Sequence, residues 1–407
     1  MQRLGGAAIH MQQALDKLTW VIGNGEILDH MSGIPALPVF DDRVISFLNN
    51  LSRIILADKE ARKFPDVVAY AFWIRKASLI PLKEKYSNGV QKIGRGIVFH
   101  IAPSNIPVQF AVSLAYALIA GNASVIRISN KRFQQVGIIC DCIKQVFLEC
   151  GDFLEDYICV VRYSHDEGIT QAFSDICDVR VIWGGDDTIK TIRQCPVQPR
   201  CIDLGFADRY SLCVIDSDVY MGLEHEIVAK DFYNDTYFND QNACSSPRLV
   251  VWTGNKIEEA KEEFWNALEE VVLDKYKMEA IMSSEKLLRT AICASVHFGI
   301  RQIKKNNYIV RVELPELYEN IMEYKGTCGY FFEYEAEDLQ EIIPMLKKEC
   351  QTITYIGEVE KRLRQLIYEN GVRGVDRIVP IGYGSHISLV WDGIDLLDIM
   401  SRKIGNS

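Results

Sequence analysis

The chain reads GIVFHIAPSNIPVQFAVSLAYALIAGNASVIRI over residues 96–128, and this stretch decides the expected fold. Gly96 to Ile101 is apolar and rich in β-branched residues, which predicts a buried strand. Pro107 to Ile119 has the length of a helix, and Ala123 to Ile128 predicts a second strand. A strand, a helix and another strand in this order indicate a parallel βαβ unit.

The same alternation extends in both directions along the chain. Further strands are expected at Tyr157 to Val161, Val179 to Trp183, Arg200 to Leu204, Ser211 to Ile215, Leu249 to Trp252, Tyr308 to Val312, Tyr330 to Tyr334 and Thr352 to Ile356. Helices are expected at Pro65 to Pro81, Lys131 to Glu149, Asp166 to Ser174, Asp186 to Arg193, Leu223 to Phe238, Ile257 to Tyr276, Glu337 to Lys347 and Glu358 to Glu369.

This pattern predicts an α/β protein with two doubly wound parallel-sheet domains. We expect a first domain over residues 1–210, with a helical N-terminal region, and a second over 211–370. Residues 371–407 form a tail that is expected to return to the first domain. Doubly wound sheets bind ligands at the carboxyl ends of their strands, so we look for site residues there.

The bulk composition excludes several classes of protein. The 407 residues are 48% hydrophobic with a net charge of -10, which argues against a nucleic-acid partner. No apolar run is long enough to cross a bilayer, and the N-terminus lacks a sustained signal-peptide core, so we expect a cytoplasmic protein. The twelve cysteines match no zinc spacing and are expected to be reduced thiols without a metal.

A single cysteine at a helix-to-strand turn is the candidate nucleophile. Cys244 lies between the expected helix that ends at Phe238 and the expected strand that begins at Leu249. A thiol there is exposed on a rigid frame, and the amides of Ala243, Cys244 and Ser245 can stabilise negative charge on an attacked carbonyl. The alternative is that Cys244 is one more small core residue among twelve cysteines.

A Pro-x-Asn-x-Pro turn follows the first strand. Pro103 and Pro107 stiffen the turn and hold the side chain of Asn105 in one place. A fixed amide near a reactive sulfur is an oxyanion donor. The alternative is that Asn105 caps the following helix.

The cofactor site is expected at two strand ends, although no G-x-G-x-x-G motif is present. Arg127, Ser129, Lys131 and Arg132 follow one strand, and cations there can pair with a 2′-phosphate, which favours NADPH over NADH. The alternative for this cluster is a solvated helix start. At Trp183-Gly184-Gly185 the glycines allow close approach of a cofactor, with Asp186 capping the next helix; the alternative is a plain tight turn.

These motifs resemble the aldehyde dehydrogenase superfamily. The resemblance rests on Pro103 to Pro107, on Ala120-Gly121-Asn122, and on Arg127-Ile128-Ser129 in place of a Lys-Pro-Ser strand. It implies that Asn105 helps Cys244 bind the oxyanion, and that the active site lies between two domains. It also implies that Gly121 and Asn122 line the adenosine half of the cofactor, and that the cofactor contacts Ile101, Ala102, Pro103 and Ser104.

A narrower resemblance covers nearly the whole chain and points to the acyl-CoA reductase (LuxC) family, which is typified by the fatty acid reductase subunit of bacterial luminescence. Five motifs carry it in the same order: Phe72 to Lys76, His100 to Pro107, Trp183 to Asp186, Gln241 to Pro247 and Trp391 to Gly393. The resemblance implies NADPH-dependent reduction of a fatty acyl thioester to the aldehyde through an acyl-cysteine. It also implies homo-oligomers and assembly with an acyl-protein synthetase and an acyl-transferase.

One departure from the superfamily bears on the reaction. Classical aldehyde dehydrogenases activate water with a glutamate, and the matching segment here is Ile202-Asp203-Leu204-Gly205-Phe206. The shorter Asp203 suits a reductase that avoids hydrolysis; it is either a shortened base or a structural carboxylate. Gly205 is assigned to the cofactor site.

Two histidines are candidate proton donors to the departing thiol, His386 in a tail loop and His100 on the first strand. The alternatives are a surface loop for His386 and a satisfied core histidine for His100. Two other functions stay open from the sequence: oxidation of aldehydes by the same cysteine, and a non-catalytic scaffold in a fatty-acyl complex.

Overall fold

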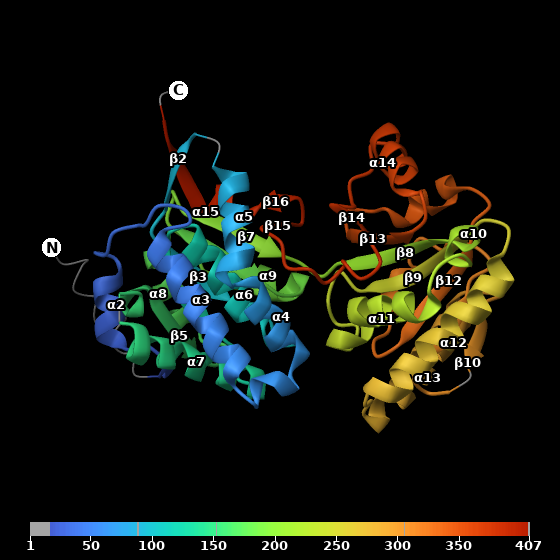
Figure 1. Cartoon of the computed structure of the whole chain (residues 1–407), viewed down its shortest axis with the longest axis horizontal. Helices are drawn as coiled ribbons and strands as arrows, with labels where there is room; N and C mark the ends of the chain where they lie inside the picture. The colour runs from blue at the N-terminus through green and yellow to red at the C-terminus, as the bar shows by residue number, and fades with distance from the viewer. Residues whose placement is uncertain (1–16, 88, 152, 305, 406–407) are drawn as a thin grey trace. The chain divides into compact units, whose positions relative to one another are not determined.

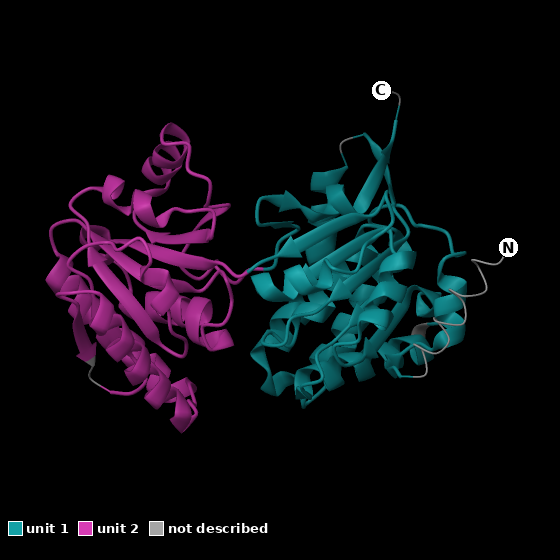
Figure 2. Cartoon of the chain, turned by 180° about the vertical axis from the view of Figure 1, so that it is seen from behind, with its two compact units in different colours: residues 1–207, 387–407 teal, residues 208–386 magenta. Residues whose placement is uncertain are grey.

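The computed structural model describes residues 17–87, 89–151, 153–304 and 306–405. The chain forms two compact units, shown in Figure 2. Unit 1 comprises Met1–Ala207 and Ile387–Ser407, and unit 2 comprises Asp208–His386. The sequence placed its boundaries after residues 210 and 370, and that domain assignment stays a prediction.

The sheet of unit 1 has the strand order β1-β5-β4-β3-β6-β7. All neighbouring strands are parallel except β1, which is antiparallel to β5. The strands are β1 (Thr19–Ile22), β3 (Ile97–Ile101), β4 (Ala123–Arg127), β5 (Ile158–Arg162), β6 (Val179–Trp183) and β7 (Ile202–Phe206).

The winding direction of this sheet reverses between β3 and β6. From β3 the chain passes outward through α6 (Gln109–Ile119) and α7 (Gln134–Cys150), and it returns through α8 (Glu167–Ile176) and α9 (Asp186–Ile192). Right-handed crossovers therefore place the two pairs of helices on opposite faces. The carboxyl ends of β3 and β6 form the switch point, where doubly wound sheets bind ligands.

The N-terminal helices pack on the α6–α7 side, with α3 in contact with both of these helices (Figure 1). They are α2 (Gly25–Met31), α3 (Asp42–Ala57), α4 (Pro65–Trp73) and α5 (Lys76–Tyr86), with short 3-10 turns η1 (Ala61–Lys63) and η2 (Glu155–Tyr157). The single helix predicted over Pro65 to Pro81 is thus two helices. The break lies at Arg75, which is extended, and the Lys76 N–H donates to Asn49 Oδ1 on α3 at 2.9 Å.

The C-terminal segment packs against the first unit. It contains β15 (Val390–Trp391), β16 (Ile394–Asp395), α15 (Leu396–Met400) and β17 (Ser401–Ile404), which pairs with β2 (Gln91–Gly94). Leu396, Leu397 and Met400 are buried in the core of unit 1. Burial of these apolar side chains holds α15 against α6.

The sheet of unit 2 has the order β10-β11-β12-β9-β8-β13-β14, and only the edge strand β10 is antiparallel to its neighbour. The strands are β8 (Tyr210–Asp216), β9 (Pro247–Thr253), β10 (Arg301–Lys304), β11 (Val310–Glu313), β12 (Tyr330–Glu335), β13 (Cys350–Ile356) and β14 (Arg377–Pro380).

Both faces of this second sheet are buried. Along β8, Leu212 and Val214 belong to one apolar cluster, whereas Cys213 and Ile215 belong to another. This alternation follows from the two-residue period of a strand with helices on both sides. Figure 1 shows α11 and α12 side by side on the second cluster's face.

The helices of unit 2 are α10 (Ser217–Tyr220), α11 (His225–Thr236), α12 (Ile257–Lys275), α13 (Ala280–Val296) and α14 (Glu360–Glu369). Short 3-10 helices are η3 (Tyr237–Asn239), η4 (Ile321–Tyr324) and η5 (Leu339–Met345). The predicted α-helix at Glu337 to Lys347 is therefore a 3-10 segment. It contains Pro344, which has no N–H for an α-helical hydrogen bond.

Candidate active site

The Cys244 loop begins where α11 ends. After η3, Asp240 and Gln241 both adopt positive φ values, +51° and +60°, which turn the chain back toward β9. The strained conformation persists because the surrounding structure fixes it. Cys244 is half-buried at the amino end of β9, as the helix-to-strand turn predicted.

Gln241 fastens this loop to the sheet. Its side chain is fully buried and makes four hydrogen bonds. Nε2 donates to the carbonyls of Pro247 (2.9 Å) and Tyr330 (3.1 Å), and Oε1 accepts from the N–H groups of Gly329 (3.0 Å) and Tyr330 (3.1 Å). The amide thus satisfies backbone groups at the starts of β9 and β12.

The backbone of Cys244 is held by a hydroxyl that sequence reasoning missed. Ser211 Oγ donates to the Cys244 carbonyl at 2.7 Å and accepts from the Thr352 N–H at 3.1 Å. The strand registers shift at this point, beside Ser211 in β8 and between Cys350 and Ile353 in β13. The only available signal was a serine at the start of an otherwise apolar strand.

The amides around the thiol were expected to be oxyanion donors, and that role stays a prediction. The Ser246 N–H donates to the Ala243 carbonyl at 3.1 Å and closes a turn around Cys244. The N–H groups of Ala243 and Ser245 have no acceptor among the residues that the structure describes. Two N–H groups in the residues that flank the thiol can stabilise negative charge on the oxygen of a carbonyl that the sulfur attacks.

Asn105 lies in unit 1, in the loop after β3. Its side chain is exposed and has no hydrogen-bond partner in the described part of the chain. The helix-cap alternative is wrong, because α6 has Val108 as its N-cap and no side-chain cap bond. The amide therefore remains available to a ligand. Its convergence with Cys244 of unit 2 stays a prediction.

The predicted cofactor residues of unit 1 lie at the carboxyl edge of its sheet. Ile101 ends β3, with Ala102, Pro103 and Ser104 following it, and Arg127 ends β4, with Ser129, Lys131 and Arg132 following it. The Arg127 guanidinium stacks on Tyr163 at 5.0 Å, and its buried Nε has no partner within the described ranges. Lys131 and Arg132 are exposed, and neither forms an ion pair there.

A fourth cation at this edge was missed. Arg162 ends β5, and its guanidinium donates to the carbonyls of Ser129 and Lys131. Burial and the charge of Arg132 lower the pKa of Arg162. Its place at the end of a predicted strand was the signal. Arg162 holds the loop that carries Ser129 and Lys131 and adds positive charge to it.

Trp183 ends β6, and Gly184 and Gly185 lead from it into α9. The Trp183 ring is buried, stacks on Phe206 at 4.1 Å, and donates from Nε1 to Ser113 Oγ at 3.0 Å. The expectation that Asp186 caps α9 is wrong, because Gly185 is the N-cap and no side chain caps it. The exposed glycine leaves the backbone accessible at the switch point.

Gly121 and Asn122 do not lie at this edge. They precede β4, at its amino end, and Asn122 is fully buried. Its Oδ1 accepts from the N–H groups of Arg95 and Gly96, and its Nδ2 donates to the Met400 carbonyl at 2.9 Å. This pair therefore does not line the cofactor site, contrary to what the resemblance implied. Instead, the Asn122 side chain joins the start of β3 to the C-terminal segment.

Asp203 is enclosed by arginines. Arg180 binds it through Nε at 3.1 Å and Nη2 at 2.6 Å, and Arg193 Nε lies 3.3 Å away. These contacts support the alternative of a structural carboxylate, and a catalytic role stays a prediction. Gly205, two residues on, packs closely against Ile189 of α9 and against Arg193, which follows that helix; a Cβ would lie 3.2 Å from Ile189.

The two histidines differ in environment. His100 is fully buried, with Nδ1 2.7 Å from Ser113 Oγ and Nε2 3.3 Å from Ser124 Oγ, and burial lowers its pKa to about 3. It is the satisfied core histidine that the alternative described. His386 is exposed in a surface loop, as its alternative described, near Asp231 and Arg377, and desolvation is the main cause of its lowered pKa.

The loop before His386 is fastened to the end of α11. Asp235 on α11 accepts the N–H groups of Gly382 (2.7 Å) and Ser385 (3.3 Å). Burial raises the pKa of Asp235 to about 7. Since α11 also leads into the Cys244 loop, the two loops share one support.

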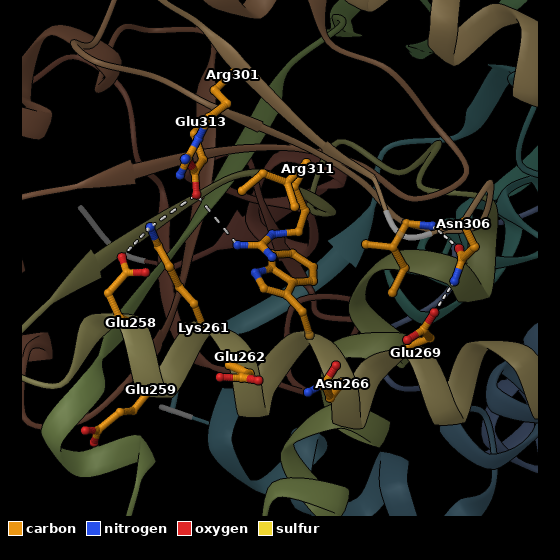
Figure 3. Close-up of a pocket in the computed structure, with 13 residues that line it drawn as sticks. Glu258, Glu259, Lys261, Glu262, Asn266, Glu269, Arg301, Asn306, Arg311 and Glu313 are labelled. Carbon is orange, nitrogen blue, oxygen red and sulfur yellow. Dashed lines mark hydrogen bonds and ion pairs between the residues drawn. The ribbon is translucent and has the colours of Figure 1, made fainter.

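A separate pocket of about 390 Å³ lies between α12 and the β10–β11 edge of unit 2. Figure 3 shows Lys261 in ion pairs with Glu258 and Glu313, and Arg311 in an ion pair with Glu313. None of the predicted site residues lines it. The cations that line it, Lys261, Arg301 and Arg311, are all paired with carboxylates of the same pocket.

The residues that the structure describes contain no group of three or more His, Cys, Asp or Glu side chains arranged to hold a metal ion. Among their helices, none has both the length and the apolar character needed to cross a membrane.

Similarity to known proteins agrees with the motifs. The family model for acyl-CoA reductase (LuxC) matches residues 76–403. The long-chain acyl-protein thioester reductase of Aliivibrio fischeri is 24% identical over 313 residues, covering 72% of this chain and 61% of the relative. The reductase of Vibrio harveyi is 25% identical, covering 72% and 60%. The chain thus spans about three fifths of the length of these relatives.

Solved structures confirm the predicted fold class. The NAD-dependent benzaldehyde dehydrogenase of Corynebacterium glutamicum aligns with a TM-score of 0.64 at 11% identity, covering 93% of this chain and 86% of that one. Lactaldehyde dehydrogenase of Escherichia coli aligns with a TM-score of 0.64 at 13% identity, covering 98% and 90%. The fold is that of the aldehyde dehydrogenases, and the chain belongs to the acyl-CoA reductase (LuxC) family.

Proposed function

We propose that this protein reduces a fatty acyl thioester, on CoA or on a protein, to the fatty aldehyde with NADPH through an acyl-cysteine at Cys244. The observation that carries the proposal is the Cys244 loop. It presents a half-buried thiol at the end of a rigid turn, with two unpaired N–H groups beside it. The names of the family relatives, long-chain acyl-protein thioester reductases, support the substrate class.

The first half-reaction follows from the thiol. The thiolate of Cys244 attacks the acyl carbon, a new C–S bond forms, and the bond to the carrier sulfur breaks. The amides of Ala243 and Ser245, together with Asn105, stabilise the oxygen as it gains charge. His386 is the proposed proton donor to the departing carrier thiol.

The residues of unit 1 fit a phosphorylated dinucleotide. Arg127 has a buried, unpartnered Nε, and Lys131 and Arg132 are exposed beside it. They would hold the 2′-phosphate, while the Ile101–Ser104 loop and Gly184-Gly185 would face the rest of the cofactor at the switch point. When bound, reduced nicotinamide supplies the hydride that brings the acyl carbon to the aldehyde level. Cys244 then leaves as thiolate and releases the aldehyde.

The state of Asp203 favours reduction over aldehyde oxidation. An oxidising enzyme of this fold needs a free base to activate water for deacylation, and the Asp203 carboxylate is already bound by two arginines. Both oxygens of this carboxylate already accept hydrogen bonds from the arginines, so it is not free to orient a water molecule. The acyl-cysteine is thereby protected from hydrolysis until hydride transfer.

The test is a reductase assay with long-chain acyl-CoA and NADPH, following loss of NADPH and appearance of aldehyde. We expect Cys244→Ala to lose turnover and covalent acyl labelling, while Cys142→Ala, which removes a buried thiol of α7, keeps both. Full activity of Cys244→Ala would exclude the covalent route. Strong oxidation of free aldehyde without CoA would point to the dehydrogenase alternative, and absence of labelling at Cys244 to a scaffold.

The assembly is part of the same proposal. We propose a homo-oligomer in the cytoplasm that receives acyl groups from an acyl-protein synthetase and an acyl-transferase. Light scattering that finds only a 46.3 kDa species would contradict the oligomer.

A further inference from the structure

A buried arginine lies four residues after the candidate nucleophile. Arg248 belongs to β9, and its side chain is 5% exposed. Its Nη1 donates to the Gly326 carbonyl, whereas its buried Nε has no partner within the residues that the structure describes. No carboxylate in that part of the chain forms an ion pair with it. Burying a cation without a paired anion is costly, so a function is expected to maintain it.

The ionisable groups that act electrostatically on this guanidinium identify its counter-charge. They are the thiols of Cys244 and Cys328, the carboxylate of Asp208 and the guanidinium of Arg289. Asp208 is largely exposed and already paired with Lys325 at 2.8 Å. Burial lowers the pKa of Arg248 to about 10. Among the charges that raise this pKa, Cys244 makes the largest contribution. An attraction between two charges is mutual, so Arg248 favours the ionised thiol to the same degree.

Contacts to the backbone hold the two segments that carry these groups. Gln241 and Ser211 hold the Cys244 loop at the amino end of the sheet, and β9 holds Arg248 directly after it. The Arg248 side chain also reaches Gly326, in the segment before β12. Both ends of the interaction therefore belong to the same rigid edge of unit 2.

We propose that Arg248 is a positioning residue whose buried guanidinium keeps Cys244 as a thiolate. The role deepens the proposed function, on which its use in catalysis rests. The thiolate is the form that attacks a thioester, and a stabilised thiolate is also the better leaving group when the aldehyde is released. One charge thus assists both the making and the breaking of the C–S bond at Cys244.

The experiment measures the rate at which Cys244 is alkylated by iodoacetamide as a function of pH, with the modified peptide quantified by mass spectrometry. We expect the wild-type midpoint to lie below the ordinary cysteine pKa of about 8.5. Arg248→Met removes the charge and should raise the midpoint by about one pH unit, which slows alkylation at pH 7 about tenfold. Arg248→Lys should recover most of the wild-type rate.

Arg301→Met is the matched control. It removes the same charge from an exposed position on the edge strand β10, three strands away in the sheet. We expect its midpoint to equal that of the wild type. Equal midpoints for Arg248→Met and wild type would overturn the proposal, as would an equal rise in the Arg301→Met control.

The wild-type protein provides a test that does not depend on the folding of a variant. A buried cation beside the sulfur should make anionic iodoacetate react faster, relative to neutral iodoacetamide, than it does with glutathione. A ratio no higher than that of glutathione would also overturn the proposal. Alkylation of Cys244 does not require turnover, so the two proposals can fail separately. A low pH midpoint of alkylation in a protein that shows no reductase activity would contradict the proposed function and leave this role of Arg248 intact.

Discussion

The two sheets present their predicted site residues at opposite ends of their strands. In unit 1 the candidate residues follow the strands, as Asn105 follows β3, and several are exposed with few contacts. In unit 2 Cys244 precedes its strand, and the loop around it is fixed by the buried side chains of Gln241 and Ser211. The difference teaches that a surface for a large ligand can stay open, whereas a nucleophile needs its environment built in advance.

The largest effect on stability is expected when the hydrogen bonds that hold the Cys244 loop are removed. Gln241→Ala removes four hydrogen bonds and leaves buried backbone groups unsatisfied, so we expect a loss of about 4 kcal/mol in the free energy of unfolding. Urea denaturation measures it. Asn242→Ala, in the half-buried neighbouring position, should cost far less. Similar stability of both variants would show that Gln241 does not fix the loop.

The support shared by the two loops of unit 2 should show in the pH dependence of stability. Burial raises the pKa of Asp235 to about 7, so the folded protein binds a proton there that the unfolded chain releases near pH 4. This contribution to stability is present below pH 4 and is lost as pH rises through 7; between pH 4.5 and 7.5 the loss is roughly 3 kcal/mol.

Denaturation of the wild type and of Asp235→Asn at pH 4.5 and 7.5 provides the measurement. We expect the wild type to lose stability relative to the variant as pH rises. Asp187→Asn, at an exposed helix start, should follow the wild type. Parallel curves for wild type and Asp235→Asn would refute the assignment of this titration.

A substitution at the exposed edge of unit 1 should change activity and leave the free energy of unfolding unchanged. Asn105→Ala removes no intramolecular hydrogen bond, so we expect unchanged stability but a fall in kcat of about 100-fold, ~2.7 kcal/mol, at the lower end for an oxyanion donor. Steady-state kinetics with acyl-CoA measures it. The neighbouring Ser104→Ala should change kcat by much less. A kcat for Asn105→Ala close to that of wild type would remove Asn105 from the site.

The smallest effect is expected at the cationic edge. The double change of Lys131→Ala and Arg132→Ala should raise the KM for NADPH about tenfold and leave that for NADH nearly unchanged, because only the 2′-phosphate loses its partners. Lys190→Ala, on the exposed side of α9, is the control. Equal changes for both cofactors would show that this edge does not read the 2′-phosphate.

Local patterns predicted much of the fold. Strand β6 was expected at its observed bounds, and the helix α12 within one residue, because apolar periodicity and length are local properties. The pattern failed where contacts from elsewhere in the chain decide the backbone. The Asn49 side chain accepts a hydrogen bond from the Lys76 N–H and separates α4 from α5. Helix α13 buries Lys286 and Thr290, so its inward face shows no apolar stripe in the sequence.

Residues that are close together in the chain predicted the alternation of strands and helices, the position of the thiol between α11 and β9, and the family. What surrounds those residues depends on the folded arrangement of the whole unit. The Ser211 hydroxyl reaches Cys244 from 33 positions away, the Gln241 amide reaches Tyr330 from 89, and the buried cation of Arg248 reaches Gly326 from 78. Such contacts follow from strand pairing across the whole unit, and no local pattern encodes them.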